Sequence, residues 1–178
     1  MALLCLLPCV ATGSGGGYHL SGSNTHVSFE VRRFGLRLFS AEFRQLSGDF
    51  VVDPSGDGGA LGVVVQMQSI DCHDPGWNTR LRSPAWLDVE KYPEMTFRSH
   101  TIHLDGRHRA TVEGELTLHG VTKTLVFTFS DIECDLSAPA AGSTCHFFGR
   151  TQIRRSDFKL PHGFWEGGDV VDILVRGI

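Results

Sequence analysis

Apolar and polar residues alternate at every second position along most of this chain, with turn-forming residues between the alternating runs. In one such run, Val27, Phe29 and Val31 are each separated by a single polar residue. A period of two places successive side chains on opposite faces of a β-strand. The pattern therefore predicts an all-β protein whose strands each have one apolar face.

Counting the alternating runs gives eight expected strands. Loops such as 53–59 and 104–107 contain glycine and aspartate, which accept the backbone angles of tight turns. Residues 75–90 do not alternate; their apolar residues have mixed spacing and Pro84 is placed to start a helical turn, so a short helical insert is expected there. The eight runs cover residues 18–33, 41–53, 60–71, 92–104, 109–119, 122–135, 145–155 and 168–178.

Eight antiparallel strands with one apolar face each can bury those faces by closing into a barrel. Such a barrel either fills its interior with side chains or holds one small ligand. The alternation does not choose between the two, but it predicts that any ligand inside is apolar. The expected architecture is an eight-stranded antiparallel barrel with the helical insert between its third and fourth strands.

Length and charge exclude several classes of protein. A chain of 178 residues fits one globular domain. Its formal net charge of −4, with no run of Lys and Arg longer than two, argues against a nucleic-acid partner. No run of 18 apolar residues is present in the sequence, so no transmembrane helix is expected.

Residues 1–17 differ from the rest of the chain because they carry no charge. A mostly apolar run over 2–11 is followed by small residues, which is typical of the core and cleavage zone of a secretory signal peptide. The basic start of a signal peptide is missing, so an N-terminal tail is the alternative. The favoured interpretation is a signal followed by one domain over 18–178, in the periplasm or secreted.

The cysteines are compatible with export. Cys134 and Cys145 flank a loop rich in small residues, and a disulfide between them would stabilise by about 3 kcal/mol in the chain-entropy model. Two buried thiols are the alternative in a reducing compartment. Cys72 is left without a predicted partner.

Four ordered segments resemble the YceI-like family: VxFxVxxFG over 27–35, LRSxxWLDVxKYPxMTF over 81–97, GxLTLHGVTK over 114–123 and RSDF over 155–158. The similarity extends over about 18–178. The resemblance implies a lipocalin-like, eight-stranded barrel that binds polyisoprenoid lipids, such as isoprenoid quinones or their precursors, in a long apolar cavity. It also implies export to the periplasm and a binding protein rather than an enzyme, with no cofactor other than a bound lipid.

The residues expected to face such a lipid are apolar positions of the strands and of the helical insert. For any one of them, ordinary core packing is the alternative. The candidates are Phe29, Val31, Phe34, Phe43, Val65, Met67, Leu81, Trp86, Leu87, Phe97, Leu118, Phe127, Phe129, Phe158 and Ile173.

A polar headgroup would need hydrogen-bond donors at the lip of the cavity. Arg33, Arg80 and Arg82 are the candidates, since a guanidinium can bind a phosphate with two nitrogens and can also lie on aromatic faces. The alternative is a solvated charge or a structural ion pair with Asp88 or Glu90.

Two other functions remain open at this level. An enzyme or redox protein could use Cys72 with a nearby histidine, and a filled barrel could serve as an interaction module.

A metal site is not expected, because His100 and His103 are an odd number of positions apart on a strand and so point to opposite faces. Oligomeric state is open, with a dimer and transient membrane contact both compatible with the sequence.

Overall fold

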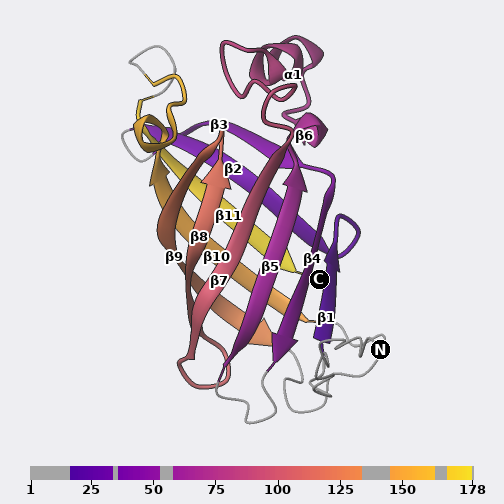
Figure 1. Ribbon diagram of the computed structural model, residues 1–178, viewed down its shortest axis with the longest axis vertical. Coiled ribbons are helices and arrows are strands. Elements are labelled where there is room, and N and C mark those ends of the chain that lie inside the picture. Colours follow the sequence, from indigo (N-terminus) through magenta and orange to yellow (C-terminus); the bar gives the residue numbers. More distant parts are fainter. Residues whose placement is uncertain (1–16, 34–35, 53–57, 134–144, 163–167, 178) are drawn as a thin grey trace, which may run out of the picture.

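A computed structural model describes residues 17–33, 36–52, 58–133, 145–162 and 168–177. These residues form one eleven-stranded antiparallel sheet and one short α-helix (Figure 1). Most of the predicted signal segment, together with Phe34 and Cys134, lies outside the described residues. The strands are β1 (Gly17–Ser21), β2 (Thr25–Arg33), β3 (Leu36–Phe43), β4 (Leu46–Val52), β5 (Gly59–Gln66), β6 (Ile70–Asp71), β7 (Glu94–Leu104), β8 (Ala110–Leu118), β9 (Val121–Glu133), β10 (His146–Arg154) and β11 (Val170–Gly177).

The sheet curls back on itself around an apolar interior. Its strand order is β1-β4-β5-β7-β8-β9-β10-β11-β2-β3-β6. The terminal pairs of this order are β1 with β4 and β3 with β6, and only Arg44 and Gln45 separate β3 from β4 along the chain. Strands near the two opposite ends of the sheet are therefore joined by this short link. The link brings the ends together and gives the sheet the barrel-like shape seen in Figure 1.

The expected all-β class with a helical insert is confirmed, but the expected count of eight strands is wrong. The expected runs 18–33 and 60–71 are each broken in two, by a turn at 22–24 and by the 3₁₀ helix η1 (Met67–Ser69). The third extra strand arises because β3 begins at Leu36, before the expected run at 41–53, and ends before β4. Each break shifts the phase of the alternation by one residue, since buried Tyr18 and Leu20 are followed by buried Val27, and buried Met67 is followed by buried Ile70. The expected runs passed over these shifts because each break is only two or three residues long.

The helix α1 (Pro75–Arg82) begins directly after its capping residue, Asp74. The side chain of Asp74 accepts a hydrogen bond from the Trp77 backbone N–H at 2.9 Å, and Pro75 occupies the first turn, where its missing N–H costs nothing. Pro84, expected to start a helical turn, lies instead in a turn closed by the hydrogen bond from Trp86 N to Ser83 O at 2.9 Å. The helix therefore occupies the first half of the expected insert, and turns occupy the second.

The helix and β1 mark opposite ends of the curled sheet. In Figure 1, α1 lies over one end, beside β3 and β6, and β1 lies toward the other. We call these the α1 end and the β1 end. No helix among the described residues is long and apolar enough to span a bilayer.

Candidate functional site: a two-part apolar interior

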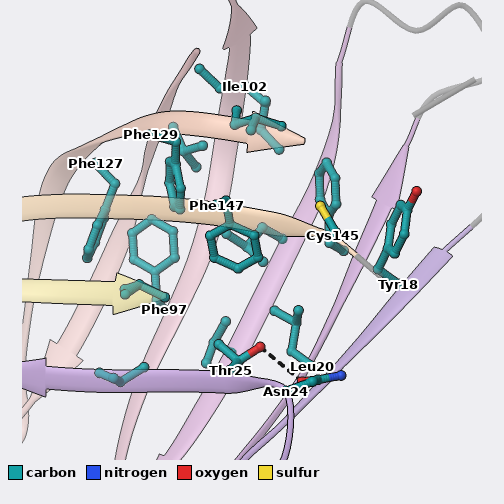
Figure 2. A pocket seen from close by; sticks show the side chains of 18 of the residues that line it. Tyr18, Leu20, Asn24, Thr25, Phe97, Ile102, Phe127, Phe129, Cys145 and Phe147 are labelled. Atoms are coloured by element: carbon teal, nitrogen blue, oxygen red, sulfur yellow. Dashed lines mark hydrogen bonds between the residues drawn. The ribbon is translucent and has the colours of Figure 1, made fainter. Parts of the chain in front are cut away.

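The β1 end of the interior contains a cavity of about 520 Å³. Aromatic side chains from strands far apart in the sequence form much of its wall (Figure 2). Phe97 and Phe127 meet edge to face with ring centroids 5.0 Å apart, and Phe129 and Phe147 do so at 5.8 Å. Its neutral polar lining includes Asn24, and the remaining wall is mainly aliphatic.

The α1 end contains a second cavity of about 550 Å³. Strand residues such as Phe29, Phe43 and Leu118 form its walls, and helix α1 with the following turns closes over it through Leu81 and Trp86. Leu81 is buried because it is on the face of the helix that meets the sheet. The helical insert thus supplies part of the cavity wall.

The two cavities meet in the middle of the molecule. Met95 of β7 and Ile173 of β11 line both of them. Both side chains are buried. The interior is therefore a pair of adjoining apolar chambers with two lining residues in common, and their combined length is greater than that of either chamber.

Positive charge is confined to the α1-end cavity. Arg80 and Arg155 line that cavity, whereas the β1-end cavity has no Lys or Arg in its described lining. No carboxylate of the described residues lines either cavity. A ligand with one polar, hydrogen-bond-accepting end would meet charged donors at the α1 end.

Arg80 is held at the mouth of the α1-end cavity by two indole rings. Its guanidinium carbon lies 5.2 Å from the ring centre of Trp77 and 5.5 Å from that of Trp86. The two indoles themselves meet edge to face, with centroids 6.4 Å apart. Cation–π contact of this kind orients a guanidinium and leaves its N–H donors available at the edge.

Most sequence-predicted residues lie on these cavities, although their role in ligand binding stays a prediction. In the β1-end cavity are Val65, Phe97, Phe127, Phe129 and Ile173, and in the α1-end cavity are Phe29, Val31, Phe43, Met67, Leu81, Trp86, Leu87, Leu118, Arg80 and again Ile173. Phe34 and the side chain of Arg33 lie outside the described residues.

Two candidates lie away from the cavities. Phe158, in the 3₁₀ helix η2 (Arg155–Phe158), is buried in the core, and its carbonyl oxygen is 3.2 Å from His119 Nδ1. Arg82 Nη2 donates to the carbonyl oxygen of Ile70 at 2.7 Å, which ties α1 to β6. Neither Phe158 nor Arg82 lines either of these two cavities. Among the described residues, Arg80 and Arg82 make no ion pair with Asp88 or Glu90.

Several lining residues were not predicted from the sequence. Trp77 is four positions before Leu81, a helical spacing that could have identified it. Arg155 was recognised as part of a family motif but not as a buried charge at a cavity, where it is 6% exposed. Met95 shares the alternation of Phe97, and that pattern could have identified it.

Cys72 is placed away from both cavities. It is a free thiol whose Sγ lies 3.1 Å from Asn78 Oδ1, the same oxygen that accepts from the Cys72 backbone N–H. Within the described ranges, no group of three or more His, Cys, Asp or Glu side chains is placed to hold a metal ion. Because Cys134 lies outside those ranges, its pairing with Cys145 stays a prediction.

The fold and the interior together define a class of protein: a barrel-like antiparallel sheet that encloses an apolar cavity. Within that class, the chain belongs to the YceI-like domain family, whose model matches residues 18–176. This confirms the resemblance seen in the four sequence segments.

Individual relatives agree with this assignment. The chain is 29% identical over 162 residues to a UPF0312 protein of Vibrio campbellii, covering 90% of this chain and 85% of that protein. The crystal structure of BcnA from Burkholderia cenocepacia superposes with a TM-score of 0.73 at 25% identity, covering 85% of this chain and 94% of BcnA. A polyisoprenoid binding domain from Saccharophagus degradans, implicated in plant cell wall breakdown, has the same fold, with a TM-score of 0.57 at 14% identity and coverage of 92% and 98%.

Proposed function

We propose that this protein is a binding protein or carrier for isoprenoid lipids, a polyprenyl chain or an isoprenoid quinone, held in its interior. The observation that carries the proposal is the pair of apolar cavities that meet at Met95 and Ile173. Each has a volume in the range of small-molecule sites. Together they offer a long apolar space, which suits a long hydrocarbon chain.

The affinity in this proposal comes from cavity length and shape. Burying one CH₂ group yields about 0.8 kcal/mol, so a five-carbon isoprene unit yields about 4 kcal/mol before the costs of ordering the chain. A filled barrel would leave no such space. The two cavities therefore favour ligand binding over a purely structural module.

The headgroup is proposed to lie at the α1 end. Arg80 stands at the mouth of that cavity and Arg155 lines its wall, so guanidinium donors are present there. Phosphate oxygens and quinone carbonyls are both acceptors that such donors bind. The hydrocarbon tail would then extend toward the aromatic wall at the β1 end.

The proposal requires no covalent chemistry. Cys72 lines neither cavity, so the described geometry gives no support to a thiol that attacks a lipid inside the barrel. A Cys72→Ser variant is expected to contain the same lipid as the wild type. Lipid loss in that variant with unchanged folding would favour a role for the thiol.

The test is native mass spectrometry of the purified protein, followed by solvent extraction and mass analysis of the released molecules. A ladder of masses spaced by isoprene units is expected. Phe127→Arg places a charge in the β1-end cavity and should remove the lipid, whereas Val126→Arg, on the outer face of the same strand, should retain it.

Folding of both variants is checked by circular dichroism. If Phe127→Arg does not fold, Leu118→Arg tests the α1-end cavity in the same way. An empty wild-type protein that stays empty after incubation with quinones and polyprenols would overturn the proposal. Equal lipid content in folded Phe127→Arg and Val126→Arg would also overturn it.

A further inference from the structure

Large apolar side chains are exposed around the mouth of the α1-end cavity. Leu36 is 69% exposed, Leu38 is 54% exposed and Trp77 is 44% exposed. Leu38 and Trp77 line the cavity directly, as does Arg80. We call Leu36, Leu38, Trp77 and Arg80 the α1-end rim.

A β-bulge directs both leucines toward this rim. Phe39 pairs with Val31 and Arg37 pairs with Arg32, so Leu38 is an extra residue in β3 without a partner in β2. Such a bulge changes which way the following side chains point. As a result, two consecutive residues, Leu38 and Phe39, both line the cavity.

Arg37 shows that Leu36 also lies on the cavity side. The Arg37 guanidinium is 3.3 Å from Glu30, whose neighbours Phe29 and Val31 face the cavity, so Glu30 and Arg37 are on the outer face. Burial would raise the pKa of Glu30, but hydrogen bonds from Arg32 and Arg37 outweigh that effect and lower it. Because neighbours on a strand alternate, Leu36 faces opposite to Arg37.

The other exposed large apolar residues of the described chain are not gathered in this way. Val51, Val126 and Val170 lie on three different strands, and none of them lines either of the two cavities. The β1-end cavity instead has polar His19 at its edge, 3.0 Å from exposed Asp49. Exposed apolar surface and a cavity mouth coincide at the α1 end.

The chemistry of the rim fits the interface of a lipid bilayer. Leucine side chains enter the acyl boundary, tryptophan prefers the headgroup level, and arginine binds lipid phosphates. Arg80 lies on the Trp77 ring and has no carboxylate partner among the described residues. A single cation at the rim favours a surface that carries anionic lipid.

We propose that the α1-end rim docks on a bilayer surface that contains anionic phospholipid. Docking there would place the mouth of the α1-end cavity against the membrane, so that an apolar ligand could pass between them without crossing water. The docking surface is inferred from the rim residues themselves. Only the reason for docking, the transfer of a lipid, rests on the proposed function.

The test is sedimentation of the purified protein with vesicles of phosphatidylglycerol and phosphatidylcholine. Binding is expected to be weakened about tenfold or more in the double variant Leu36→Ser with Leu38→Ser, because two apolar side chains no longer enter the bilayer. The matched double variant Val51→Ser with Val126→Ser removes as many exposed apolar residues elsewhere and is expected to bind like the wild type. Arg80→Gln should weaken binding about fivefold.

Each outcome decides the inference. Folding of the rim double variant is checked by circular dichroism. If it does not fold, Leu36→Ser alone replaces it, because Leu36 is the most exposed of the three apolar rim residues. Equal sedimentation of rim and control variants, absence of wild-type binding, or equal binding to pure phosphatidylcholine would overturn docking on an anionic bilayer.

Two further results would change the interpretation of the rim. If the wild type forms a dimer that the rim variant does not form, and neither binds vesicles, the rim is assigned to a second copy of the chain. Vesicle binding by a protein that never contains isoprenoid would remove the proposed function and leave docking intact.

Discussion

Asp71 shows how a single carboxylate supports the α1 end. Its oxygens accept hydrogen bonds from Asn78 Nδ2 at 2.8 Å, from the His73 backbone N–H at 2.8 Å and from Arg44 Nε at 2.7 Å. These bonds, led by the one from Asn78, hold the pKa of Asp71 well below its ordinary value. One side chain of β6 thus joins the residue that follows β3 to helix α1.

The lowered pKa of Asp71 predicts a pH dependence of stability. A carboxylate with a depressed folded pKa contributes fully above its unfolded pKa of about 3.9, and the contribution is lost as pH falls through the folded pKa. Wild type should therefore exceed Asp71→Asn in unfolding free energy at neutral pH, and the difference should shrink below about pH 4. Urea titrations of both proteins across this range measure it; a difference independent of pH would contradict the assignment.

Gly149 makes room for an aromatic ring of the cavity wall. A Cβ atom placed at Gly149 would lie 2.4 Å from Cε1 of Phe129, on the neighbouring strand β9. Gly149→Ala should therefore displace the ring and lower the unfolding free energy by roughly 1–3 kcal/mol, the usual cost of overpacking. Gly62→Ala is the matched control, because a Cβ there meets nothing within 4 Å. Thermal unfolding of the two variants compares them, and equal midpoints would show that Phe129 moves freely.

At the scale of elements, the sequence predicted what is periodic and local. Period-two alternation located most of the strands, and its loss over 75–90 located the helical insert, although Pro84 and not Pro75 was expected to start a helical turn. The breaks inside the strands depend on contacts with other strands, such as the hydrogen bond from Gln66 N to Gln45 O at 2.9 Å. In the same way, the bulge at Leu38 depends on how β3 pairs with β2. The alternation of apolar and polar residues along one strand does not say which strand it pairs with or in what register.

The cap of α1 gives a prediction for this element. Asp74→Ala removes the acceptor for Trp77 N–H and should cost about 1 kcal/mol of local helix stability. Amides of the first turn of α1 should then exchange with deuterium faster, as measured by hydrogen exchange with mass spectrometry. Amides of β8, a strand paired with β7 on one side and β9 on the other, provide the internal control. Unchanged exchange in α1 would mean that packing alone holds the helix.

At the scale of the whole molecule, the apolar interior could be predicted but the two cavities within it could not. Alternation indicates which residues face inward, and nearly all described candidates do. Whether inward side chains fill the space depends on the curvature of the sheet and on how α1 closes one end, and both are set by contacts across the molecule. The sequence does not distinguish Arg80, which lines the α1-end cavity, from Arg82, which bonds to Ile70, since two residues on one short helix differ only in what they meet in three dimensions.

The meeting point of the two cavities offers the sharpest test of the interior as one binding space. Ile173→Phe adds volume where both cavities are lined, and it should divide the interior. If one chain occupies both cavities, the extracted lipids should lose their longest members and keep the shorter ones, because a short chain fits one cavity alone. Ile173→Leu, which conserves volume, should leave the distribution of chain lengths unchanged. Identical distributions in Ile173→Phe and wild type would mean that the ligand occupies one cavity and that the second serves another purpose.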